Sequence, residues 1–249
     1  MYIIQKDILY RKSYCAPMMR CVGPIEAEMI VDEVHNDSCI LHSGYKTIAA
    51  KIMRMRYFWP SLYHDVANIV KRSKSFQRYA PHNRMPRHDM IPVNSPWPFH
   101  KWAIDIVGPF PAGPGNVKFP IVAIDYFTKW VEAKTVRTIT GVQANGLCEV
   151  TNRDIVSGIK KWLYENRIGW VDELPNVLWA HRTTFKKSTG ETPFSLVYGS
   201  EAVILAEIRV PTHRVANFDE EANGEALCEN LNLMEERRLI VAIREANNK

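Results

Sequence analysis

The chain has 249 residues, 46 % hydrophobic and 24 % charged, so it can bury a core and is neither wholly disordered nor collagen-like. No apolar run approaches the ~18 residues needed to cross a bilayer, and the first residues lack a signal-peptide layout, so we expect neither membrane insertion nor export. The formal charge of +5 is uneven, because residues 1–100 carry 14 Lys or Arg against 8 Asp or Glu. The five cysteines form no C-x-x-C pair, which predicts an intracellular, reducing compartment.

The first 80 residues predict a small, mostly helical module. Residues 1–24 have the pattern of short β-strands. Apolar spacing predicts helices beginning at Ile25 and running over 46–55 and 62–72. The aromatic block at 57–59 is followed by Pro60, which ends the second helix because a residue before proline disfavours the α region. We expect these aromatic residues to form the module's core, in preference to a platform for stacking bases.

A proline-rich stretch over residues 81–100 predicts a stiff, extended connector. The chain then shows three apolar runs of strand length, at 102–107, 119–125 and 130–136, which predict a consecutive antiparallel meander. Helical spacing returns at 150–163 and 170–181, and residues 219–249 predict one polar helix. The expected fold class is α+β or α/β, divided into segments 1–80, 81–100, 101–210 and 211–249.

Two histidines, His35 and His42, have the spacing of half a zinc site. Two later positions with the spacing of a cysteine pair would complete a tetrahedral structural Zn²⁺ site with thiolates. Those positions hold Ser73 and Phe76, and neither a neutral hydroxyl nor a phenyl ring replaces a thiolate. The sequence therefore predicts a degenerate zinc site.

These histidines belong to a set of motifs that continues through most of the chain. The resemblance rests on His35-x6-His42, the block 57–60, the stretch 71–78, and the blocks 102–109, 123–133, 178–182 and 190–199. Together they resemble the integrase region of plant gypsy-type LTR-retrotransposon Gag-Pol polyproteins. In that family, positions 73 and 76 are cysteines of an HHCC zinc-binding module.

The resemblance implies an RNase H-like catalytic core after the zinc-binding module. In the family, two Asp and one Glu hold a pair of Mg²⁺ or Mn²⁺ ions for DNA integration, since phosphoryl transfer uses one metal at each reacting oxygen. It also implies polynucleotidyl transferase activity, DNA as partner (the element's ends and its target), a nuclear location and a homo-oligomer.

Two of the three carboxylates have counterparts. Asp105 matches the first acid and Glu149 the third, and 44 positions separate them. No Ser-Asp-Asn-Gly-type turn lies between them to carry the second. Asp125 matches a non-catalytic position, for which a hydrogen-bonding role is expected. The resemblance therefore implies a truncated core whose strand-transfer activity is lost or severely reduced.

A basic stretch follows the third predicted helix. Between residues 71 and 88 there are six cations and no acid: Lys71, Arg72, Lys74, Arg78, Arg84 and Arg87. Such a stretch suits contacts with phosphates, although a solvated face beside a linker has the same composition.

Three interpretations remain open on sequence. The first is an integrase-derived protein that is catalytically impaired. The second is a non-catalytic nucleic-acid-binding module that uses the basic stretch. The third is the product of a pseudogene without function. A gene model that omits the middle of the core explains the deletion but not Ser73 and Phe76.

Overall fold

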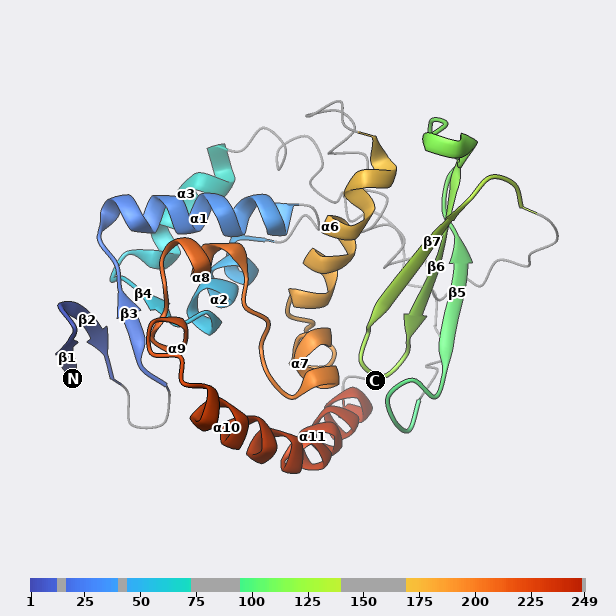
Figure 1. Cartoon of the computed structure of the whole chain (residues 1–249). Coiled ribbons are helices and arrows are strands. Elements are labelled where there is room, and N and C mark those ends of the chain that lie inside the picture. The colour runs from blue at the N-terminus through green and yellow to red at the C-terminus, as the bar shows by residue number, and fades with distance from the viewer. Residues whose placement is uncertain (13–16, 40–43, 73–94, 140–168, 248–249) are drawn as a thin grey trace. The chain divides into compact units, whose positions relative to one another are not determined.

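The computed structural model describes residues 1–12, 17–39, 44–72, 95–139 and 169–247 (Figure 1). The chain divides into two units. The first unit contains Met1–Cys39, Ser43–Arg78 and Ala202–Cys228, and the second contains Ile40–His42, Tyr79–Glu201 and Glu229–Lys249. The architecture is a mixture of helices and sheets, as the sequence predicts. No helix among the described residues is both long and apolar enough to span a bilayer.

The first unit begins with a small sheet of order β1-β2-β3-β4. Its strands are β1 (Tyr2–Gln5), β2 (Ile8–Arg11), β3 (Met19–Cys21) and β4 (Tyr57–Phe58). The first two form a hairpin whose two turn residues, Lys6 and Asp7, have φ of 50° and 60°. Two left-handed residues in a row match the right-handed twist of the strands that they join. The prediction of short strands over residues 1–24 is confirmed.

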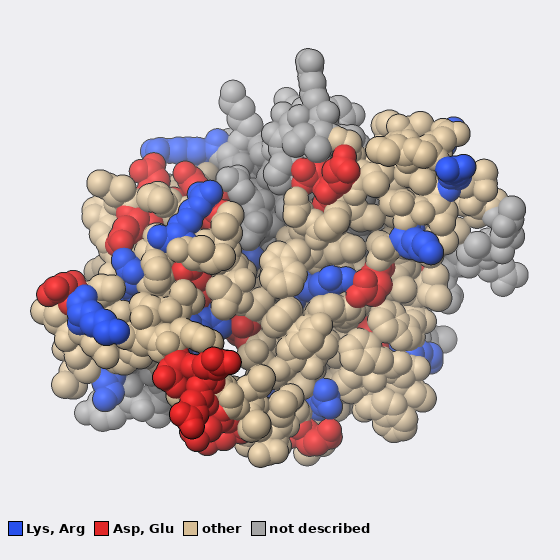
Figure 2. All heavy atoms as spheres, in the orientation of Figure 1, with Lys and Arg blue, Asp and Glu red and all other residues tan. Residues whose placement is uncertain are grey.

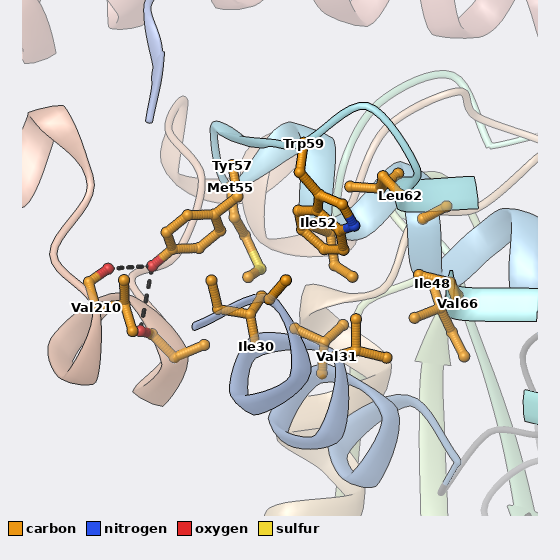
Figure 3. Close-up of a cluster of buried hydrophobic side chains, with 14 of the residues drawn as sticks. Ile30, Val31, Ile48, Ile52, Met55, Tyr57, Trp59, Leu62, Val66 and Val210 are labelled. Carbon is orange, nitrogen blue, oxygen red and sulfur yellow. Dashed lines mark hydrogen bonds between the residues drawn. The ribbon is translucent and has the colours of Figure 1, made fainter. Parts of the chain in front are cut away.

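Three helices contribute to the core of the first unit: α1 (Pro24–Cys39), α2 (Tyr45–Arg54) and α3 (Leu62–Arg72). Their apolar faces meet in one cluster, which Figure 3 shows. Tyr57 and Trp59 lie inside this cluster, 0 % and 6 % exposed. The aromatic block is therefore core, as predicted. The end of α2 has a different cause from the predicted one, because the chain leaves the helix at Arg56, which has a φ of 66°, four residues before Pro60.

The second unit contains a sheet of order β5-β6-β7, with both pairs antiparallel. The strands are β5 (Trp102–Ile106), β6 (Phe119–Asp125) and β7 (Val131–Val136). Helix α6 (Trp170–Thr183) covers one face, because alternate residues of the strands are apolar and pack against Trp170, Leu174 and Val177. The predicted meander is confirmed.

The single helix predicted over residues 219–249 is two helices in the structure. These are α10 (Glu220–Asn232) and α11 (Met234–Asn247), separated at Leu233. The break places Met234, 4 % exposed, against Gly199 at the end of α7 (Pro193–Tyr198). Arg237 then donates to the Gly199 carbonyl at 2.9 Å. The predicted helical stripe at 150–163 lies outside the described residues.

We expect His181, on the buried face of α6, to make the stability of this protein depend on pH. The side chain is 2 % exposed, and burial, with Lys186 and Arg182 nearby, lowers the pKa of His181 well below its ordinary value of 6.5. The unfolded chain therefore binds a proton below pH 6.5 that the folded chain does not, so stability is retained above this pH and lost as the pH falls below it. Between pH 7.5 and 5.5 the loss should be about 1.4 kcal/mol.

Urea unfolding at the two pH values measures this loss in the wild type and in His181→Gln. The variant should lose about 1.4 kcal/mol less than the wild type over the same interval, because glutamine does not titrate. Equal losses in the two proteins would show that His181 is not the group responsible.

Candidate metal and catalytic residues

One of the four predicted zinc-site positions lies in a described element. His35 is near the C-terminal end of α1, whereas His42, Ser73 and Phe76 lie outside the described residues. A structural zinc site needs four nitrogen or sulfur donors, and this set supplies two imidazoles, a hydroxyl and a phenyl ring. The donor set therefore does not fit a structural zinc ion. In the part of the chain that the structure describes, no three His, Cys, Asp or Glu residues are placed to hold a metal.

Asp105 lies on β5, opposite Val122 of β6. The register puts it on the same face of the sheet as Ala103, which is the face that packs against α6. Asp105 is partly exposed, and its Oδ1 accepts a hydrogen bond from the backbone N–H of Ile106 at 2.8 Å. The other predicted metal ligand, Glu149, lies outside the described residues. One carboxylate of the predicted pair thus has a described position.

The strand that carries Asp105 forms one edge of the described sheet. β5 pairs with β6, and within the described ranges no strand pairs with its other side. Ile104, the neighbour of Asp105, is 52 % exposed. Such an edge presents backbone N–H and C=O groups that an additional strand would use.

Asp125, at the end of β6, has a structural role, as expected. It is 0 % exposed, and its Oδ2 accepts hydrogen bonds from the backbone N–H of Thr128 at 2.8 Å and from the Thr128 hydroxyl at 2.6 Å. Its Oδ1 accepts from the Phe99 N–H at 3.0 Å. The carboxylate thereby closes the β6–β7 turn and holds the residues that precede β5.

The predicted basic stretch begins inside α3. Lys71 and Arg72 are exposed residues of its last turn, where cations also interact favourably with the helix dipole. The other four cations, Lys74, Arg78, Arg84 and Arg87, lie outside the described residues.

A cavity of about 480 Å³ opens beside Arg72 in the first unit. Its wall includes Asp65 on α3, whose Oδ2 accepts hydrogen bonds from the Ser61 hydroxyl at 2.7 Å and from the Trp59 indole at 2.9 Å. These donors lower the pKa of Asp65. The sequence offered no signal for this cavity, since concavity results from how the helices pack.

Glu207 is 0 % exposed in the first unit and was not predicted from the sequence. A signal was present, because Glu207 interrupts the otherwise apolar run from residue 202 to residue 208. An acid in such a run is either at the surface or paired in the interior, and the sequence does not show which.

Comparisons with known proteins match this chain to integrase-related sequences. Residues 22–82 match the model of the integrase zinc binding domain. A Pro-Pol polyprotein of feline foamy virus is 21 % identical over 223 positions, covering 70 % of this chain and 19 % of the viral protein. A human gypsy retrotransposon integrase-like protein is 27 % identical over 114 positions, covering 44 % of this chain and 21 % of that protein. Together these matches support the predicted resemblance to an integrase region of a retroelement polyprotein.

This integrase-like chain spans about a fifth of the length of each of these two relatives. The alignment with the foamy virus protein extends over 223 positions but takes in 70 % of the 249 residues here, so the viral protein has residues without a counterpart in this chain. The matched zinc binding domain contains the four positions of the degenerate site.

We predict that Asp125→Ala destabilises the protein by about 3 kcal/mol or more, because two backbone N–H groups and a hydroxyl lose their buried acceptor. Asp172→Ala, at an exposed acid in the first turn of α6, is the matched control and should cost less than about 1 kcal/mol. Urea unfolding measures both. Similar small losses in the two variants would contradict a structural role for Asp125.

Proposed function

We propose that this chain is an integrase-derived protein that binds DNA without joining DNA strands. The observation that carries this proposal is the set of family carboxylates in the sequence: Asp105 and Glu149 have counterparts, and the second Asp has none. Three carboxylates both position and partly neutralise a pair of divalent metals, and two do not suffice for the pair. The donor set therefore does not fit the two-metal centre of the family.

We further propose that β5, β6, β7 and α6 are what remains of an RNase H-like core. An antiparallel meander with a helix packed on one face supports this proposal. The edge of β5 that no described strand occupies is where an additional strand of a larger sheet would pair. The longer alignment of the foamy virus protein supports the same interpretation, since that protein has residues that this chain lacks.

For the zinc-binding module we propose family membership without a tightly bound zinc ion. The match over residues 22–82 supports descent from a zinc-binding domain, while Ser73 and Phe76 stand at the thiolate positions. Two imidazoles and water make a weak, exchangeable site, far from the ~10–16 kcal/mol of a four-ligand structural zinc. A nuclear location accords with DNA as the partner.

DNA binding is the part of this function that the basic stretch supports. We expect weak binding to duplex DNA that is largely independent of sequence, with a log–log salt slope approaching about −5 when all six cations contact phosphates. Fluorescence anisotropy at several salt concentrations measures the slope. Replacing Lys71, Arg72, Lys74 and Arg78 with Gln should reduce both the affinity and the slope.

A charge-matched control replaces four exposed cations elsewhere, Lys6, Lys12, Lys134 and Arg137, with Gln. This control should retain most of the affinity. A slope near zero in the wild type, or equal losses in the two quadruple variants, would exclude the basic stretch as the DNA-binding surface.

Strand transfer should be absent from this chain. Without a complete carboxylate set the reacting oxygens lose electrostatic stabilisation, which slows the reaction by at least ~10²–10³-fold. The measurement is joining of a labelled donor end to target DNA in Mg²⁺ or Mn²⁺, with Asp105→Asn as background. The two proteins should be indistinguishable, and activity restored only by inserting an Asp-bearing segment between Asp105 and Glu149. Wild-type activity above the Asp105→Asn background would show that the site is complete and would refute the proposal.

A further inference from the structure

Residues 202–216, here called the return segment, pack into the core of the first unit although most of that unit precedes residue 79. The segment includes the short helices α8 (Leu205–Arg209) and α9 (His213–Ala216), of which α8 lies against α1 (Figure 1). Ile204, Ala206 and Val210 are 4 %, 2 % and 5 % exposed and belong to the apolar cluster of α1, α2 and α3. The segment is therefore a component of this core and not a surface tail.

An ion pair with a buried carboxylate constrains the shape of the return segment. The Glu207 carboxylate is 0 % exposed and accepts two hydrogen bonds from Arg214, from Nε at 2.9 Å and from Nη2 at 2.6 Å. The Thr212 hydroxyl donates to the same carboxylate at 3.0 Å, and Arg214 Nη2 also donates to the Ala202 carbonyl at 2.9 Å. A bidentate pair holds both side chains in one geometry.

Two side chains of the first unit then bind the backbone of the segment. The Tyr57 hydroxyl donates to the carbonyls of Ala206 and Val210, the first at 3.2 Å, as the dashed lines in Figure 3 show. Arg20 of β3 donates from Nη1 to the Pro211 carbonyl at 2.7 Å. The Ala206 carbonyl also accepts from the Val210 N–H at 2.9 Å. The Val210 and Pro211 carbonyls follow the end of α8, where carbonyls lack the intrahelical donors of a helix interior, so Tyr57 and Arg20 supply donors for them. Burial, together with the charge of Glu207, raises the pKa of Tyr57, which keeps this hydroxyl a donor.

These contacts bear on the zinc site. A module of about 80 residues is small for a stable core of its own, and structural zinc commonly supplies what is missing. Here the donor set lacks both thiolates. We propose that the return segment replaces zinc as the element that holds the first unit folded, through the Glu207–Arg214 pair and the apolar side chains that it adds to the core.

Amide hydrogen exchange of the whole chain, followed by mass spectrometry, tests the proposal. The probes are the amides of α2 and α3, and those of β6 report on the second unit. Dialysis against EDTA, or addition of Zn²⁺ afterwards, should change protection of α2 and α3 by less than about twofold. A loss of protection in EDTA, or a gain of tenfold or more with Zn²⁺, would overturn the proposal.

The decisive variant is Arg214→Gln, which removes the hydrogen-bonded cation of the fully buried Glu207 carboxylate. Because the proposal makes the segment necessary for the whole unit, protection of α2 and α3 should fall about 100-fold or more, with β6 unchanged. The matched control is Arg209→Gln on the same segment. Arg209 also forms an ion pair, with its Nη1 2.8 Å from Oε2 of Glu33, but its side chain is 57 % exposed. This control should lower protection less than about fivefold.

If Arg214→Gln increases exchange within residues 202–216 while α2 and α3 keep their protection, the segment is a passive attachment and the proposal is wrong. If this variant unfolds the second unit as well, Tyr57→Phe takes its place, because it keeps the ring in the core and removes the donor to two carbonyls. The expected loss of protection in α2 and α3 is then about tenfold. Unchanged protection in Tyr57→Phe would equally refute the proposal.

Discussion

A carboxylate buried without solvent must keep its hydrogen-bonding partners, because an unpaired charge in the interior destabilises a fold by several kcal/mol. Glu207 meets this condition in the first unit through Arg214 and Thr212, which lie a few residues further along the chain. The hydrogen bonds among Glu207, Thr212 and Arg214 constrain the conformation of residues 202–216 from within the segment itself. The apolar side chains of that segment can then pack beside α1, and Tyr57 binds carbonyls 149 and 153 positions away in sequence.

The second unit uses a buried carboxylate in a similar way. Asp125 gathers the Thr128 turn and the Phe99 backbone, so its charge is fully hydrogen-bonded and serves the fold. Asp105 contrasts with both buried acids, since it is partly exposed and lies on a strand at the edge of the described sheet. A residue that ligates a metal has to keep oxygen atoms accessible, whereas a residue that closes a turn does not. The environment of each acid thus separates structural carboxylates from a candidate ligand.

The two degenerate sites differ in how their losses can be offset. Structural zinc contributes free energy of folding, and such energy can come from any set of packed side chains and satisfied hydrogen bonds. The contacts of residues 202–216 are of this kind. A two-metal centre contributes positioned charge at two reacting oxygens, and packing elsewhere in the molecule does not supply it. Under the two proposals made above, this chain stays folded without the thiolates, while the missing catalytic carboxylate removes the reaction.

The local elements and the resemblance to integrases could be inferred from the amino-acid sequence alone. Apolar spacing predicted α3 at Leu62–Arg72 and the three strands β5, β6 and β7. The motifs, among them the one that contains Asp105, indicated a resemblance to integrases. These features depend on neighbours within a few residues, which periodicity records. The folded molecule was needed to see that Glu207 is buried and paired, and that the helix predicted over residues 219–249 breaks at Leu233, where Met234 packs against Gly199. The partners of Glu207 are close in sequence, but its burial and the position of Met234 depend on contacts between residues distant in the chain. A periodic pattern shows which face of a segment is apolar but not what covers it.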